Sequence, residues 1–196
     1  MRVDLRSHVG YTLVELLLVL MAASVLLSVA VPITATTIDA GRARHAAGFV
    51  ATRFRLARQQ AVARTTSVGL VFDRVNGRWL VRVCADGNGN GVRRAEILSG
   101  PDRCLEGPHD IESMFPGIQV AVDSTLQGPG GEPPSGDAVR FGRGDIASFS
   151  ASGSCTAGSV FLRSKQQVQY AIRVFGVTGR TRILRDNPVG GVWEEM

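Results

Sequence analysis

A long apolar stretch near the N-terminus, residues 10–32, constrains this chain more than any other feature. Residues 16–31 contain no charged residue, no Gly and no Pro. With residues 11–15 added, a helix over this stretch reaches roughly 30 Å, the thickness of the hydrocarbon layer of a membrane. Glu15 is the one charge within it. A carboxylate is costly in lipid, so Glu15 calls for a partner and indicates a functional role.

Two ordinary interpretations explain the stretch only in part. A secretory signal also combines a basic start with an apolar core, and Ser28-Val29-Ala30 would serve as its cleavage site. The apolar run is too long for such a core, however, and Glu15 interrupts it. A plain single-pass anchor fits the length but explains neither Glu15 nor the abrupt boundary at Gly10.

The motif at residues 10–16, Gly-Tyr-Thr-Leu-Val-Glu-Leu, resembles the class III signal of type IV prepilins and type II secretion pseudopilins. The resemblance implies that a prepilin peptidase cleaves after Gly10 and methylates the new N-terminus at Tyr11, where the family most often has Phe. It also implies that Glu15 pairs with the N-terminal amine of a neighbouring subunit in a filament. Pro32 stands where the long helix of the family often kinks.

This resemblance sets the expected organisation of the chain. It implies a leader at residues 1–10, a transmembrane and assembly helix at residues 11–32, and a domain beyond, for which one globular unit of ordinary size is expected. The protein would be a single-pass protein of the inner membrane with its C-terminal domain in the periplasm. Its expected partners are the prepilin peptidase, other pilin or pseudopilin subunits, and the inner membrane.

Residues 33–65 are predicted to continue the membrane helix as an amphipathic helix. Apolar residues recur there at roughly helical intervals: Ile33, Ile38, Phe49, Val50, Phe54, Ala57, Ala61 and Val62. The polar side carries six arginines: Arg42, Arg44, Arg53, Arg55, Arg58 and Arg64. The favoured interpretation of these arginines is a solvated face.

Residues 66–196 have the pattern of an antiparallel β-sheet domain, so the predicted fold class is α+β, and the resemblance makes it pilin-like. From residue 67 the apolar period is two, and Asn76-Gly77 supplies the turn of a β-hairpin. Further strands are predicted at residues 118–122, 138–141, 146–150, 160–163, 170–175 and 180–184. Two segments dense in Gly and Pro are predicted to be loops, residues 99–117 and 127–137.

Three cysteines are present: Cys84, Cys104 and Cys155. Outside the cytoplasm one disulfide is chemically permitted and one thiol is left over. Cys84 and Cys104 are the favoured pair because they would close a short loop, although nothing in the sequence proves it. The three cysteines do not have zinc-finger spacing.

Residues 86–91, Asp-Gly-Asn-Gly-Asn-Gly, resemble the start of a calcium-binding loop. An EF-hand loop places its bidentate Glu at the twelfth position, but that position is Ile97, and Glu96 falls one residue short. The segment also lies between strand-like runs rather than helices. A Gly/Asn turn is therefore the favoured interpretation, and no metal site is predicted.

Signatures of an enzyme are missing from the sequence. The three histidines, His8, His45 and His109, are scattered, and no nucleophile elbow or Walker loop surrounds the single Lys165. No catalytic residue and no cofactor are predicted. An enzyme is the least favoured class of function.

Charge of a single sign is most clearly concentrated at residues 163–185, which contain six basic residues and no acidic residue. The motif Gly179-Arg180-Thr181-Arg182 in this segment puts two arginines on one face of a strand, about 7 Å apart. Each guanidinium group can bind a phosphate as a bidentate donor, and the Gly would let backbone donors approach. Four neighbours could extend this patch: Lys165, Arg163, Arg173 and Arg185. Such contacts bind the DNA backbone without reading its sequence. The alternative is a charged, exposed hairpin.

From the N-terminal signal to residues 170–184, YAIRVFGVTGRTRIL, the chain is similar to the GspH/FimT branch of minor pilins and pseudopilins. In FimT-like members the GRxR motif contributes to DNA binding during natural transformation, which implies double-stranded DNA as a partner here. GspH-like members instead sit near the tip of the type II secretion pseudopilus. The sequence therefore leaves two hypotheses, a structural filament subunit and a DNA receptor.

Overall fold

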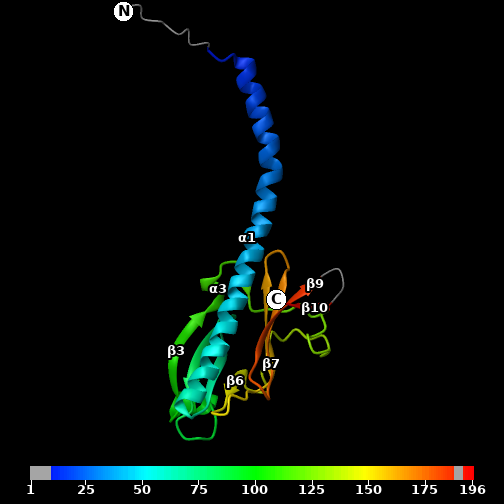
Figure 1. The fold of residues 1–196 in the computed structure, drawn as a ribbon. Helices are drawn as coiled ribbons and strands as arrows, with labels where there is room; N and C mark the ends of the chain where they lie inside the picture. Colours follow the sequence, from blue (N-terminus) through cyan, green and yellow to red (C-terminus); the bar gives the residue numbers. More distant parts are fainter. Residues whose placement is uncertain (1–9, 188–191) are drawn as a thin grey trace, which may run out of the picture. The chain divides into compact units, whose positions relative to one another are not determined.

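The computed structural model describes residues 10–187 and 192–196. Apart from Gly10, the predicted leader at residues 1–10 lies outside the described residues. The chain forms two compact units, Met1–Ile38 and Asp39–Met196. The helix α1, Leu13–Arg64 (Figure 1), contributes to both units. By these bounds it continues through Pro32. The predicted long N-terminal helix is therefore confirmed.

In the first unit, the described part of α1 is apolar and exposed. None of the described side chains from residue 13 to residue 38 is buried. This part of the helix is long and apolar enough to cross a membrane, by length and composition. Ile33 and Ile38 are 60% and 48% exposed, so their predicted place on a buried face is wrong. No described residue of their own unit packs over them.

In the second unit, α1 contributes a buried stripe of mostly small side chains. The stripe consists of Ala43, Ala46, Ala47, Val50, Ala51, Phe54, Ala57 and Ala61. Counted from Ala43, they fall at i+3, i+4, i+7, i+8, i+11, i+14 and i+18, which places them on one face of the helix. Val62 falls off this face and is 50% exposed, contrary to the prediction. All side chains that are buried in the described structure belong to the second unit, which therefore has a core of its own.

The first sheet of the described residues has the strand order β3-β2-β1-β6. Its strands are β1 Val68–Val75, β2 Arg78–Ala85, β3 Arg103–Asp110 and β6 Ile146–Phe149. The predicted hairpin is confirmed, because β1 and β2 are antiparallel and Asn76 and Gly77 have φ of 51° and 81°, as in a type I′ turn. The predicted loop at residues 99–117 is wrong, since it contains β3 and the short helix α3, Ile111–Met114.

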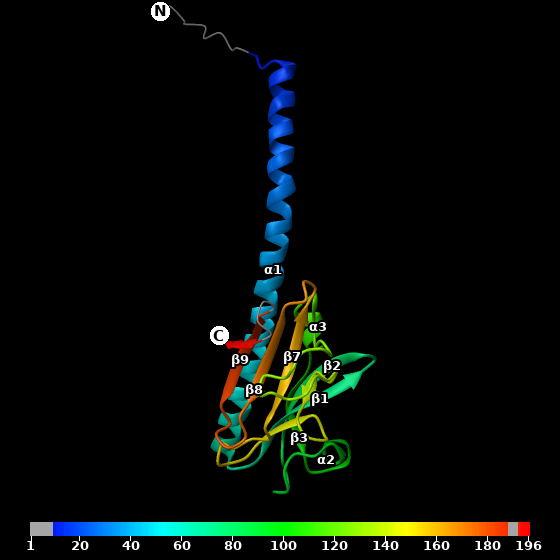
Figure 2. The same cartoon turned by 90° about the vertical axis from the view of Figure 1, so that its right-hand side faces the viewer.

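The second sheet has the order β10-β9-β8-β7-β4, and β5 also pairs with β7. Its strands are β4 Ile118–Gln119, β5 Val139–Arg140, β7 Gly158–Ser164, β8 Gln169–Val174, β9 Thr181–Asn187 and β10 Val192–Glu195. Figure 2 shows β7, β8 and β9 side by side, and their antiparallel pairing confirms the strands predicted at residues 160–163, 170–175 and 180–184. The strands predicted at residues 118–122 and 138–141 are shorter than expected, and β10 was not predicted.

Side chains from α1 and both sheets meet in one core. The ring of Phe54 on α1 lies between three buried rings, with centroids 5.5 Å from Phe141, 6.2 Å from Phe72 and 6.3 Å from Phe149. Such tilted aromatic pairs add packing energy beyond the area that they bury. A helix packed in this way on antiparallel sheets makes the fold α+β, as predicted.

Asp86 organises the Gly/Asn turn at residues 86–91. Its carboxylate accepts hydrogen bonds of 2.7 to 3.0 Å from three backbone N–H groups, those of Asn88, Gly89 and Gly91. Burial raises the pKa of Asp86, but these N–H groups lower it by more, so its pKa lies below the ordinary value. The predicted turn is confirmed. The helix α2, Arg94–Ser99, follows it where a strand-like run was expected.

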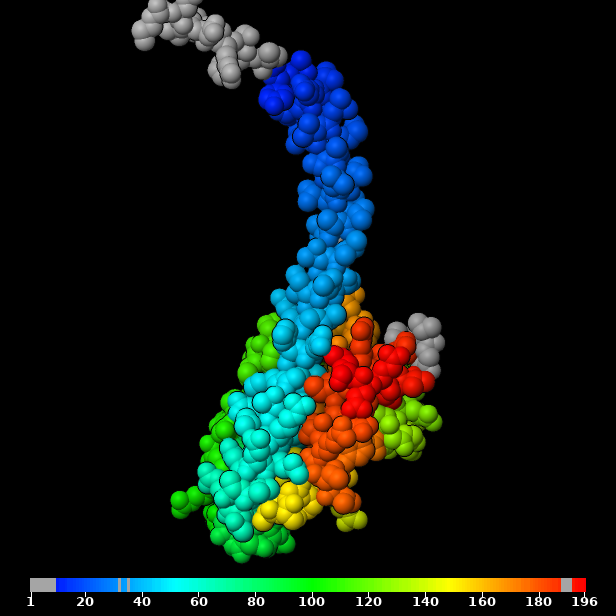
Figure 3. All heavy atoms as spheres, in the orientation of Figure 1, coloured from blue at the N-terminus to red at the C-terminus, as the bar shows by residue number. Residues whose placement is uncertain are grey.

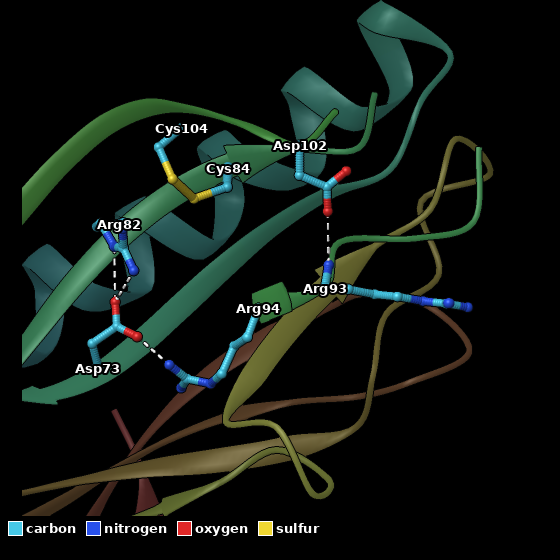
Figure 4. The surroundings of a disulfide bond; sticks show 7 residues. All are labelled: Asp73, Arg82, Cys84, Arg93, Arg94, Asp102 and Cys104. Carbon is cyan, nitrogen blue, oxygen red and sulfur yellow. Dashed lines mark hydrogen bonds and ion pairs between the residues drawn. A yellow bond between two sulfur atoms is a disulfide. The ribbon is translucent and has the colours of Figure 1, made fainter. Parts of the chain in front are cut away.

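A disulfide joins Cys84 on β2 to Cys104 on β3 (Figure 4). The two cysteines lie opposite each other in the register of these strands. This confirms the pair that the sequence analysis favoured because a disulfide between these cysteines closes a short loop. Beside it, the carboxylate of Asp73 forms ion pairs with Arg82 and Arg94, which link β1 to β2 and to α2.

Candidate nucleic-acid interface

The GRTR motif spans the end of the turn between β8 and β9 and the first two residues of β9. Gly179 is buried there, and its N–H donates to the carbonyl of Phe175 at 2.7 Å. Its φ of +60° is in the left-handed region, which favours glycine. A Cβ atom at Gly179 would lie 2.2 Å from the carbonyl oxygen of Gly153. The absence of a side chain therefore lets the turn close onto a neighbouring loop, and this fixes where Arg180 emerges.

A cleft of about 660 Å³ lies beside this turn. It is lined by Arg55, Arg58 and Gln59 of α1, by residues 178–183 of the turn and β9, and by the end of β10. Figure 3 shows β9 (orange) and the C-terminal strand (red) next to the cyan part of α1. The fold thus brings four arginines from two distant segments onto one surface, which we call the arginine cleft: Arg55, Arg58, Arg180 and Arg182.

Three of these arginines keep donors available for an anion. Arg55 and Arg180 are exposed, and neither guanidinium group has a hydrogen-bond or ion-pair partner among the described residues. The Nε of Arg58 donates to the carbonyl of Gly153 at 3.1 Å, which holds this side chain against the GRTR turn. The terminal nitrogens of Arg58 make no hydrogen bond within the described chain. A guanidinium group presents its donors in a fork that matches phosphate oxygens.

Arg182 differs because it has an internal partner. Its Nη1 lies 3.0 Å from Oε2 of Glu195 on β10. Its Nε is buried without a hydrogen-bond partner in the described structure, and its guanidinium carbon lies 5.2 Å from the centroid of the Phe175 ring. The two ion-paired side chains are 36% and 45% exposed, and exposed ion pairs contribute little. A phosphate can therefore compete with Glu195 for Arg182.

The other predicted DNA-binding residues do not line the arginine cleft. Arg173 lies opposite Arg182 in the register of β8 and β9, but its guanidinium forms an ion pair with a loop carboxylate. Arg185 is three residues beyond Arg182 on the same strand, so strand alternation puts its side chain on the other face. Arg163 is on β7 and Lys165 is in the turn between β7 and β8, so both lie near the start of β8, at the end away from the GRTR turn. There they line a separate hollow of about 310 Å³.

The carboxylate that neutralises Arg173 belongs to Glu132, in the loop at residues 127–137. The two side chains approach to 2.7 Å. Burial raises the pKa of Glu132, but the N–H of Gly130 and the charge of Arg173 lower it by more, so the pKa lies below its ordinary value. Glu132 is therefore ionised at neutral pH, and Arg173 adds little net positive charge.

No family model matches this chain, and no curated protein or solved structure does either. The property that the residues of the arginine cleft share is positive charge that the described chain compensates only at Arg182.

The guanidinium groups of the cleft are donors suited to the binding of anions such as phosphate. The described thiol that is not in the disulfide, Cys155, is half-buried, and burial raises its pKa to about 12. It is therefore protonated at neutral pH and a poor nucleophile. In the part of the chain that the structure describes, no three His, Cys, Asp or Glu residues are grouped so that they could hold a metal ion.

The sequence-based prediction missed Arg55 and Arg58, which it assigned to a solvated helix face. A usable signal was present. Among the six arginines predicted on that face, these two are the one pair at a spacing of three or four residues. That spacing makes them neighbours on one side of a helix. Which side of the helix meets the GRTR turn depends on the tertiary fold.

Proposed function

We propose that this protein is a minor pilin or pseudopilin subunit of a type IV pilus or type II secretion filament, and that it binds double-stranded DNA non-specifically through the arginine cleft, as in natural transformation. The motif at residues 10–16 and the exposed apolar helix support the filament role. In this proposal the fold is pilin-like, α1 is anchored in the inner membrane, and the second unit lies in the periplasm. The disulfide fits such an oxidising compartment.

Glu15 supports assembly into a filament. Its backbone N–H is bonded to the hydroxyl of Thr12 at 3.2 Å, but its carboxylate has no partner among the described residues. A carboxylate inside a membrane needs such a partner. Cleavage after Gly10 would create a positive amine at Tyr11, and the amine of a neighbouring subunit would neutralise Glu15.

Replacing Gly10 with Ala is expected to block processing completely, so that the chain keeps residues 1–10. The mass and N-terminal sequence of the purified protein measure this, and the parent chain should begin at methylated Tyr11. Ala30→Leu is the matched control and should leave processing unchanged. A mature N-terminus near Val31, lost in Ala30→Leu, would show instead that the stretch is an ordinary secretory signal.

The observation that carries the DNA-binding proposal is the convergence of Arg55, Arg58 and Arg180 without internal acidic partners. Guanidinium groups on two walls of one cleft can contact phosphates along a DNA backbone. Since no base edge needs to be read, such binding is independent of sequence and weakens steeply with salt.

The test is a titration of the full-length protein in neutral detergent with duplex DNA at several salt concentrations. The Arg180→Gln, Arg182→Gln variant should bind about tenfold or more weakly at low salt, because charge-assisted hydrogen bonds are lost. Its slope of log affinity against log salt should be shallower by about 2, since each phosphate contact contributes about 0.9.

A matched control removes the same charge elsewhere. Arg163→Gln, Lys165→Gln changes two basic residues at the opposite end of β8 and should keep the affinity and slope of the parent. Absence of salt-dependent binding by the parent would refute the DNA-binding role. Equal losses in the two double variants would show that net charge, and not the cleft, is responsible.

A pseudopilus subunit that serves protein secretion without binding DNA is the alternative function. The ion pairs Arg182–Glu195 and Arg173–Glu132 favour it, because they give two of the predicted DNA-binding arginines a structural role. In that case the Gly10→Ala result would stand while the parent would show no salt-dependent DNA binding.

A further inference from the structure

Phe175, at the end of β8, is an exposed aromatic side chain next to the arginine cleft. It is 36% exposed. The other aromatic side chains that the structure describes in the second unit are buried or half-buried. Phe175 therefore differs from these residues in offering an exposed ring, next to arginines, to which a ligand could bind.

Two guanidinium groups lie at this ring. The guanidinium carbons of Arg182 and Arg173 are 5.2 and 5.6 Å from its centroid. Arg182 lines the arginine cleft, whereas Arg173 lines a second hollow of about 270 Å³. Phe175 also lines that hollow, so the ring lies between the two depressions.

The second hollow carries both donors and acceptors around an aromatic wall. It is lined by Arg140, Ser159 and Phe161 as well as by Glu132 and Arg173. The guanidinium carbon of Arg140 lies 4.6 Å from the centroid of the Phe161 ring. The volume is small for a ligand site, but it has room for one planar ring.

We propose that Phe175 and this hollow bind an unpaired nucleobase of a single strand whose phosphates occupy the arginine cleft. This inference rests on the proposed DNA binding and specifies its ligand. Every base has a π-face that stacks on an aromatic ring, and arginine adds a cation–π contribution. In a duplex these faces are covered by neighbouring bases, so the ring can act only on unpaired nucleotides. The protein then binds single-stranded or frayed DNA more tightly than intact duplex.

Arg182 connects the two parts of the proposed site. Its ion pair with Glu195 is half-exposed and therefore weak, so a phosphate can replace the carboxylate. One nucleotide can then place its phosphate at Arg182 and its base at Phe175. The hollow offers mixed donors and acceptors rather than one fixed pattern, which predicts tolerance of all four bases.

The test uses the full-length protein in neutral detergent and three probes: oligo-dT of about 12 nucleotides, a strand of the same length made of abasic sites, and a duplex of that length. The parent should bind oligo-dT about tenfold more tightly than the abasic strand, which carries the same phosphates. Phe175→Ala should remove this difference while keeping the affinity for the duplex, which also shows that the variant is folded.

Two further variants sharpen the result. Phe175→Leu keeps apolar bulk without a ring and should behave like Phe175→Ala. Val177→Ala, in the same turn and 92% exposed, should behave like the parent. Equal binding of oligo-dT and the abasic strand by the parent, or an unchanged preference in Phe175→Ala, overturns the inference and leaves the duplex-binding proposal intact. A parent that binds none of the probes overturns both.

Discussion

Replacing Gly179 with Ala is expected to lower the free energy of unfolding of the second unit by about 2 to 5 kcal/mol. A left-handed conformation costs an L-residue about 1–2 kcal/mol, and a forced overlap in a packed region costs about 1–3 kcal/mol more. The overlap arises because the new Cβ would lie 2.2 Å from the carbonyl oxygen of Gly153 and 2.9 Å from Nε of Arg58. A backbone oxygen cannot rotate away, so the turn itself must move.

The same shift should weaken DNA binding, because it separates Arg180 from Arg58 on the opposite wall of the cleft. Urea unfolding of residues 39–196, followed by tryptophan fluorescence, measures the stability, and the duplex titration measures the binding. That segment contains all the side chains that are buried in the described structure.

Gly142→Ala is a matched control for this prediction. Gly142 has φ of +59°, almost that of Gly179, but a Cβ there would meet no atom within 4 Å. Gly142→Ala should therefore show the conformational cost alone, about 1–2 kcal/mol. If Gly179→Ala costs no more than Gly142→Ala, the close approach to Gly153 has no energetic role and the motif glycine does not hold the cleft together.

The elements that were predictable from the sequence are those whose local chemistry decides their conformation. The Asn76-Gly77 turn is one, because both residues adopt positive φ easily and the flanking strands alternate. The long helix is another, because an apolar run of this length could satisfy its backbone hydrogen bonds in a membrane by forming a helix. In both cases the signal lies in residues that are consecutive in the sequence.

β3 and β10 could not be predicted because pairing partners hold them in place. β3 has the sequence RCLEGPHD, in which Gly and Pro favour a loop. It is a strand because it pairs with β2. β10, with the sequence VWEE, pairs with β9 and packs Trp193 on Phe161. Strands at a sheet edge often lack a clean alternating pattern, and only the fold assigns them.

In the candidate site, too, some features follow from residues that are close in sequence and others depend on the tertiary fold. The GRTR motif was recognisable because its glycine and two arginines are close in sequence. The wall that α1 contributes was not, because Arg55 and Arg58 reach the turn only when the helix packs its Ala-rich stripe on the sheets. Lys165 is near the GRTR motif in the sequence, but it precedes β8 whereas the motif follows β8. The two therefore lie at opposite ends of that strand.

Loss of the Cys84–Cys104 disulfide is expected to lower the free energy of unfolding of residues 39–196 by about 3 kcal/mol. The two cysteines are 20 residues apart, and closing a loop of that size removes much conformational entropy from the unfolded chain. Urea unfolding with and without reductant measures the effect. The Cys84→Ser, Cys104→Ser variant should show the low value under both conditions.

The position of the disulfide makes a second outcome informative. It joins two strands of the first sheet, whereas the arginine cleft is built from α1 and the second sheet. Reduction should therefore lower stability but leave the affinity for DNA unchanged below the unfolding transition. Cys155→Ser is the control, because this half-buried thiol is not in the disulfide and its loss should make stability no more sensitive to reductant. If a fully reduced chain unfolded at the same urea concentration as the oxidised one, pairing of β3 with β2 would be sufficient without the covalent link.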